Sequence, residues 1–257
     1  MTLHAGALEL TVLGAGPAYS DHPGAIGAAY LVRHGTTCIV LDLGQGTFSR
    51  LAGAIEPSSV DAIFVSHLHP DHFIDLVPLR HYLRWEFRPG RRVRVLGPRG
   101  LAGRLDALHD EVGFAAGGLD VDDVEGVREI RVGSLTVEAG LVHHTDESYA
   151  FRVSTGDGGP ALVYSGDCGR AADLEPLIRV GDTLLSEVSF GTGPVDPEAA
   201  HLDAPSVGEL AARTHVGRLL LTHLPMGHDR SATIDSARSR YEGAVDLVAP
   251  GFTTTIA

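Results

Sequence analysis

The chain of 257 residues contains no lysine and no asparagine, and all 20 of its basic residues are arginines. The missing lysine excludes Schiff-base chemistry, a pyridoxal phosphate anchor and the lysine of a nucleotide-binding P-loop. Two cysteines, Cys38 and Cys168, are too few for a disulfide framework or a cysteine-rich zinc site, which favours a reducing, cytoplasmic setting. Neither a secretory signal nor a run of about 18 apolar residues is found, so we expect neither export nor a membrane span.

Positive charge is also scarce, because 33 acidic residues outweigh the arginines and give a net charge of −13. Such a surface repels DNA, RNA and anionic lipid, which argues against long nucleic acids or a membrane as partners. The composition, 44% hydrophobic and 21% charged, is otherwise that of an ordinary folded protein. We therefore expect a single domain over residues 1–257.

Short apolar runs alternate with segments of helical spacing along the chain. The runs predict strands over residues 8–13, 28–32, 37–43, 61–66, 93–96, 135–141, 150–153, 161–165, 183–187 and 219–222. The helical spacing predicts helices over residues 73–87, 101–110, 171–178, 205–214 and 231–241. Strands in antiparallel clusters with helices between them indicate an α+β fold of two face-to-face sheets with helices outside. Gly14 and Gly16 are interpreted as part of a turn, because the third glycine of a dinucleotide fingerprint is missing.

The most informative motif is SHLHPDH, which directly follows a buried strand. Extended backbone sends His67 and His69 to the same side, because side chains alternate along a strand. Pro70 suits the first position of a helix, which places Asp71 and His72 in its first turn. Three imidazoles and a carboxylate so close together match the nitrogen and oxygen ligands of borderline divalent metals. The motif therefore predicts a metal site.

This His67-X-His69-X-Asp71-His72 motif resembles the signature of the metallo-β-lactamase superfamily. The resemblance covers residues 8 to about 256 and implies a four-layer αββα sandwich with up to two metal ions. It extends to three later segments, each of which places a histidine or aspartate just after an apolar strand.

The later segments supply the rest of the ligand set that the resemblance implies. HTDESYAFR is similar to the third motif of the phosphodiesterase and tRNase Z branch and assigns its ligand to His144, with the neighbouring His143 as the alternative. ALVYSGDCG matches the bridging aspartate at Asp167, and LLLTHLP matches the last ligand at His223. One ion is then held by His67, His69 and His144, the other by Asp71, His72 and His223, with Asp167 between them.

Two ions about 4 Å apart would share a water, lower its pKa towards about 7 and clamp an in-line displacement at phosphorus. Zinc is the expected metal, and manganese or iron are alternatives. The predicted catalytic residues are Asp71 and His201, the second of which lies 22 residues before His223. His201 resembles the histidine that protonates the leaving oxygen in tRNase Z-like enzymes, although Asp203 stands where a serine or threonine is usual; an exposed loop histidine is the alternative.

Three further features carry less weight. Glu187 resembles the acid that supports this histidine, with a capping or buried ion-pair role as an equal alternative. Cys168, beside Asp167, is interpreted as a small filler. The segment Arg80–Arg104 holds 8 of the 20 arginines together with aromatic residues and could hold nucleic acid. We favour the interpretation that its Leu79–Trp85 portion packs in the core or forms a dimer contact, which leaves a homodimer open.

Chain length within the resemblance favours small substrates. Only 22 residues separate His144 from Asp167, too few for the tRNA-gripping arm of tRNase Z. The chain is most similar to compact bacterial phosphodiesterases, including actinobacterial enzymes that hydrolyse cyclic nucleotides, which implies a small phosphodiester as substrate. The alternatives are a tRNase Z-like RNA 3′-processing endonuclease and a lactonase or other ester hydrolase. The intact ligand set argues against a non-catalytic binding module.

Overall fold

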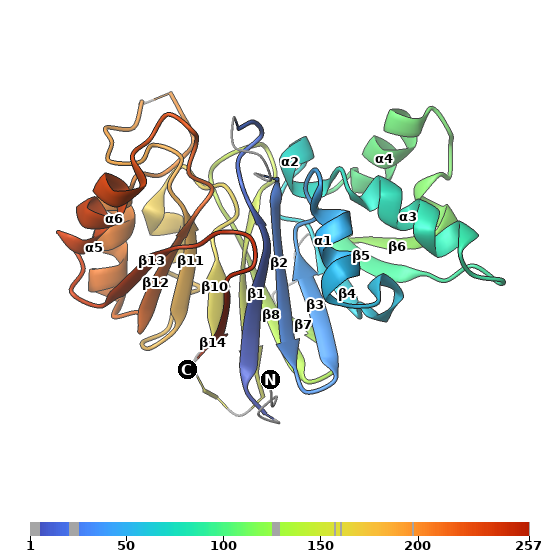
Figure 1. The fold of residues 1–257 in the computed structure, drawn as a ribbon, viewed down its shortest axis with the longest axis horizontal. Coiled ribbons are helices and arrows are strands. Elements are labelled where there is room, and N and C mark those ends of the chain that lie inside the picture. The colour runs from blue at the N-terminus through green and yellow to red at the C-terminus, as the bar shows by residue number, and fades with distance from the viewer. Residues whose placement is uncertain are drawn as a thin grey trace.

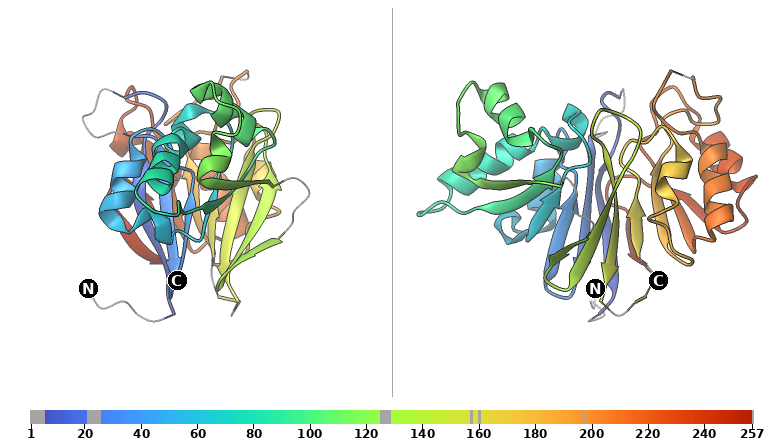
Figure 2. Two further views of the ribbon diagram at one scale, coloured as in Figure 1. Left: turned by 90° about the vertical axis from the view of Figure 1, so that its right-hand side faces the viewer. Right: turned by 180° about the vertical axis from the view of Figure 1, so that it is seen from behind.

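The computed structural model describes residues 6–20, 26–124, 129–156, 158–159, 161–196 and 198–256. Within them the strands form two seven-stranded sheets that pack face to face, with helices on the outer sides (Figure 1; Figure 2). This is the αββα sandwich that the sequence predicts. No helix among the described residues is long and apolar enough to span a membrane.

The first sheet has the strand order β14-β1-β2-β3-β4-β5-β6. Its strands are β1 (Leu8–Ala15), β2 (Ala28–His34), β3 (Thr37–Leu41), β4 (Ala62–Phe64), β5 (Val93–Gly97), β6 (Leu119–Asp123) and β14 (Thr253–Ile256). β1, β2 and β3 pair antiparallel, whereas β3 to β6 are parallel. Buried leucines of α1 (Thr47–Ala54), α3 (Leu76–Trp85) and α4 (Leu101–His109) pack on its outer face.

The second sheet has the strand order β13-β12-β11-β10-β9-β8-β7. Its strands are β7 (Glu129–Val132), β8 (Leu135–Leu141), β9 (Tyr149–Thr155), β10 (Leu162–Tyr164), β11 (Thr183–Glu187), β12 (Arg218–Thr222) and β13 (Ala244–Leu247). Here too an antiparallel run, β8 to β10, is followed by a parallel run, β10 to β13. α5 (Ala204–Thr214), α6 (Arg230–Arg238) and a 3₁₀ turn over Ala171–Leu174 cover its outer face.

The two halves of the chain therefore repeat one arrangement. In each, antiparallel strands lead into parallel strands joined by helices or helical turns, so several strands run in the same direction. The inner faces of the sheets pack through buried apolar residues, among them Phe64 of β4 and Phe151 of β9, whose ring centroids lie 5.6 Å apart. This packing sets the carboxyl ends of β3 and β4 opposite those of β8, β10 and β12.

Some predicted elements differ from the observed ones. The helix predicted over residues 73–87 is divided into α2 (Pro70–Phe73) and α3, because Asp75 leaves the helical path: its N–H donates to Leu43 O at 3.0 Å and its carboxylate accepts from Phe48 N at 2.7 Å. The helix predicted over residues 171–178 is only the 3₁₀ turn. Gly14 lies in β1, not in a turn, at a bulge where an added Cβ would come within 2.0 Å of Gly27 O.

Candidate metal centre

The SHLHPDH segment adopts the local structure that its sequence predicts. His69 is extended, with φ −82° and ψ 140°, and α2 begins at Pro70. Asp71 and His72 consequently lie in the first turn of α2 and are buried. The segment starts where β4 ends, so its side chains enter the space between the carboxyl ends of the two sheets.

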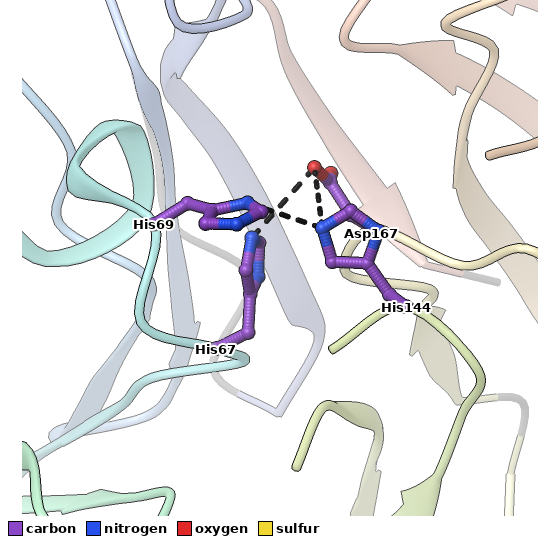
Figure 3. A group of neighbouring side chains, drawn as sticks. All are labelled: His67, His69, His144 and Asp167. Atoms are coloured by element: carbon purple, nitrogen blue, oxygen red, sulfur yellow. Dashed lines mark hydrogen bonds and ion pairs between the residues drawn. The ribbon is translucent and has the colours of Figure 1, made fainter. Parts of the chain in front are cut away.

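The structure brings the seven predicted ligands together in two groups. Within each group the candidate ligand atoms lie within 4.8 Å of one another. The first group, drawn in Figure 3, is His67, His69, His144 and Asp167, and the second is Asp71, His72 and His223. This is the partition that the resemblance implies, and ligation by these residues stays a prediction.

Asp167 lies between the two groups and offers one oxygen to each. Its Oδ2 is 3.7 Å from Nε2 of both His67 and His144. Its Oδ1 is 3.4 Å from His72 Nε2 and 3.7 Å from His223 Nε2. A carboxylate divided in this way can join two metal ions.

Hydrogen bonds to Nδ1 of His67 and of His72 turn the Nε2 atom of each ring towards the site. Ser66 Oγ donates to Asp42 Oδ2 at 2.8 Å, so the Ser66 oxygen accepts from His67 Nδ1–H at 3.1 Å. His72 donates its Nδ1–H to Asp42 Oδ2 at 2.7 Å. Both imidazoles therefore keep the Nε2 lone pair for a metal, which is how outer hydrogen bonds usually orient a ligating histidine.

The histidines of the second sheet are held in the same manner. His144 Nδ1–H donates to Ala200 O at 2.8 Å, and His223 Nδ1 lies 3.2 Å from Ser189 Oγ. His69 differs, because its Nδ1 faces the group and lies 3.1 Å from His144 Nε2. Five nitrogen atoms thus converge on the two carboxylates of the site.

Two buried atoms and the local electrostatics support a cation here. Among the described residues, His67 Nε2 and Asp167 Oδ1 are buried without a hydrogen-bond partner, a costly state that a metal ion would relieve. Burial would lower the pKa of His72 and of His223, yet the Asp167 carboxylate raises both. Burial, with His72 nearby, instead holds the pKa of His67 well below its usual value, so its imidazole is neutral. The donor set fits two divalent ions, and nitrogen with oxygen suits zinc, manganese or iron.

Asp42 is a residue of this site that the sequence analysis did not identify. It directly follows β3, is fully buried, and accepts hydrogen bonds from Ser66 N at 2.6 Å and Tyr164 OH at 2.7 Å besides those described above. Its φ of 58° is unusual for a residue other than glycine, as is the φ of 60° at His223. Its position after an apolar strand, shared with the predicted ligands, is the signal that could have identified it.

His201 reaches the site from the loop before α5. Its Nδ1 lies 3.0 Å from Glu187 Oε1 and 3.9 Å from Asp167 Oδ2. Burial opposes its positive charge, but the hydrogen bond to Glu187 raises the pKa of His201 overall. Asp203 is the N-cap of α5 and accepts from Ser206 N at 2.9 Å, a role that aspartate and serine share.

Glu187 organises this loop from the end of β11. It is buried, and besides His201 its carboxylate accepts from the backbone N–H groups of Cys168, Leu202 and Ser189 at 3.2, 3.1 and 2.8 Å. Cys168 is fully buried, and burial raises the pKa of its thiol to about 12, as expected of a filler. A neutral thiol is a poor metal ligand.

A cavity of about 550 Å³ opens above the two groups. Its polar lining includes Asp71, Asp167, His201 and His223. His228, from the turn after β12, also lines it. The predicted ligands His69, Asp71, Asp167 and His223 therefore share one cavity with the predicted proton donor.

Other predicted features lie away from this cavity. His143 is exposed, and its backbone N–H donates to Asp173 at 2.9 Å. In the arginine-rich segment, Leu79 and Leu83 are buried in the core as expected, whereas the Trp85 side chain is 63% exposed and does not join it. Arg80 is buried and donates to Phe114 O at 2.7 Å.

Comparison with known proteins identifies relatives of the whole chain. Residues 39–224 match the family described as "Beta-lactamase superfamily domain". An uncharacterized protein of Mycobacterium leprae is 33% identical over 97% of this chain and 89% of its own length. A ribonuclease Z of Mycolicibacterium paratuberculosis is 29% identical over 93% of this chain and 95% of its own. The crystal structure of the metallo-beta-lactamase fold protein YhfI from Bacillus subtilis, a probable metallo-hydrolase, has the same fold, with a TM-score of 0.86 and 23% identity over 97% of this chain and 99% of that one.

The adjacent histidines provide a matched test of the ligand assignment. His144→Ala should lose metal, because the side chain of His144 faces the first group, whereas His143→Ala should retain it. Metal content of both purified variants, measured by mass spectrometry, decides the assignment. Metal loss in His143→Ala with normal content in His144→Ala would place the ligand one residue earlier.

Asp42→Asn should weaken metal binding by about 10- to 100-fold, because it replaces the charge that holds His72 and offers an N–H where a donor already points. Competition with a chromophoric chelator measures this affinity. Asp61→Asn is the matched control, since its carboxylate accepts from Cys38 N at 2.8 Å at the opposite end of β4. Equal affinities in the two variants would show that Asp42 does not orient a ligand.

Proposed function

The chain belongs to the beta-lactamase superfamily, and on this basis we propose that it is a dinuclear metal-dependent phosphodiesterase that hydrolyses small phosphodiesters such as cyclic nucleotides. The observation that carries the proposal is the division of Asp167 between two groups of ligand atoms beneath one cavity. Two bound divalent ions would supply Lewis-acid charge and activate a water molecule for attack on phosphorus. The protein supplies the remaining steps.

His201 is the proton donor in this proposal. Glu187 binds its Nδ1, which leaves Nε2–H as the proton that can be given to the leaving oxygen. The hydrogen bond to Glu187 raises the pKa of His201, which favours the protonated imidazole that a general acid requires. Three backbone N–H groups donate to Glu187 and hold its carboxylate in place. The carboxylate in turn positions His201 beside Asp167.

The short connection between His144 and Asp167 and the negative net charge both support a small substrate. The connection between His144 and Asp167 has only 22 residues and includes β9 and β10, so it is too short for a long arm that could hold RNA. The net charge of −13 opposes binding of a long polyanion, since each phosphate contact needs local positive charge. The runner-up is RNA processing, which the ribonuclease Z relative favours.

Activity on a panel of substrates tests the proposal. The metal-loaded protein should hydrolyse 3′,5′-cyclic nucleotides or bis-p-nitrophenyl phosphate, with weak dependence on ionic strength, and should cut precursor tRNA slowly or not at all. A lactone serves as the substrate for the ester hydrolase alternative. Efficient cleavage of tRNA with every small diester intact would replace this proposal by the runner-up.

His201→Ala should slow cleavage of a diester with an alkoxide leaving group by roughly 10²- to 10⁴-fold, because that oxygen needs a proton to depart. Cleavage of bis-p-nitrophenyl phosphate should fall far less, since p-nitrophenolate leaves unprotonated. Steady-state kinetics on both substrates, with metal content measured in parallel, gives the comparison. Glu187→Gln, which keeps the shape but loses the charge, should show a smaller loss of the same kind. Equal losses on both substrates would indicate a structural role for His201.

A further inference from the structure

The main cavity has an apolar side besides its metal-ligand side. The apolar residues that line it are Pro17, Ala18, Tyr19, Pro70, Phe190 and Pro225. Two of them are aromatic, and the Tyr19 side chain is 70% exposed although it borders the site. The cavity volume of about 550 Å³ lies in the range of small-molecule sites, which combine apolar walls with a few polar groups.

Hydrogen bonds hold the backbone at Phe190 and at the two residues that precede Tyr19. Phe190 N donates to Leu202 O at 3.0 Å, and Gly193 N donates to Phe190 O at 2.7 Å. Gly191 has a φ of 50°, and a Cβ there would come within 2.4 Å of His228 Nδ1, so only glycine fits the turn behind the ring. The Gln45 side chain donates to the carbonyls of Pro17 and Ala18 at 3.2 and 3.4 Å, next to Tyr19. A backbone that is held in advance loses little freedom when a ligand binds.

The described lining of this cavity contains no arginine, and the chain has no lysine. Arg99 and Arg104 line a separate cavity of about 320 Å³ on another side of His69, where Arg99 lies 3.8 Å from Glu147. A substrate in the main cavity can therefore place one phosphodiester at the metal centre, but a second phosphate would meet no arginine. The remainder of the substrate must suit an aromatic, apolar wall.

We propose that Tyr19 and Phe190 bind the base of the substrate by stacking, and that they select nucleoside cyclic monophosphates over diesters without a base. The Phe190 ring centroid lies 6.5 Å from that of His201, which puts one stacking surface beside the proton donor. A base held there leaves its sugar and single phosphodiester over the metal-ligand side of the same cavity. This inference rests on the proposed phosphodiesterase function.

The experiment compares 3′,5′-cyclic AMP with the 3′,5′-cyclic phosphate of methyl riboside, which lacks the base. For the metal-loaded wild-type protein, KM should be lower for the nucleotide. In Phe190→Leu and in Tyr19→Leu, the preference for the nucleotide, measured as the ratio of the two KM values, should fall by roughly 5- to 150-fold, the range expected for loss of one base–aromatic stack. Trp85→Leu is the matched control, because Trp85 is an exposed aromatic residue outside the cavity, and its ratio should equal that of the wild type.

An unchanged ratio in both variants overturns the inference, as does an equal change of KM for both substrates, which would indicate a general disturbance of the cavity. If the wild-type protein cleaves neither substrate, the proposed function fails, and the inference is then decided by binding. Calorimetric titration with adenosine 5′-monophosphate should give weaker binding to Phe190→Leu and Tyr19→Leu than to Trp85→Leu. Equal dissociation constants in all three variants would overturn it.

Discussion

The buried carboxylate of Asp42 is the interaction on which the rest of the site depends. A charged group without solvent is costly unless hydrogen bonds surround it, and here four donors do so. The donors come from both sheets, because Ser66 and His72 follow β4 whereas Tyr164 belongs to β10. Asp42 thus orients His72 directly and His67 through Ser66, and through Tyr164 it joins the sheet that contributes Asp167.

Local chemistry explains why the SHLHPDH segment could be predicted so closely. Alternation along an extended chain and the preference of proline for the first turn of a helix act over a few residues, and both govern His69, Pro70 and Asp71. The approach of His144, Asp167 and His223 is different in kind. It depends on contacts between residues up to 152 positions apart, so only the resemblance to a family could assign these three to one site.

The features that sequence analysis missed carry weak local signals. Asp42 is a single aspartate after a strand, a pattern shared by many turns and caps. β6 reads LDVDD, which is too acidic for a typical strand, and pairs only at the edge of its sheet. α1 buries only Thr47 and Leu51, so its apolar periodicity is faint. In each case the neighbouring structure, not the segment itself, determines the outcome.

The repetition of one arrangement in the two halves has a consequence for unfolding. Each candidate ion site draws on both halves: His67 and His69 meet His144, and Asp71 meets His223. An ion bound at either place would cross-link the halves, and neither half could hold it alone. Because a ligand that binds only the native state stabilises it by mass action, metal would make the two sheets unfold as a single cooperative unit. The metal centre would then stabilise the fold by cross-linking its two halves, in addition to being the site of reaction.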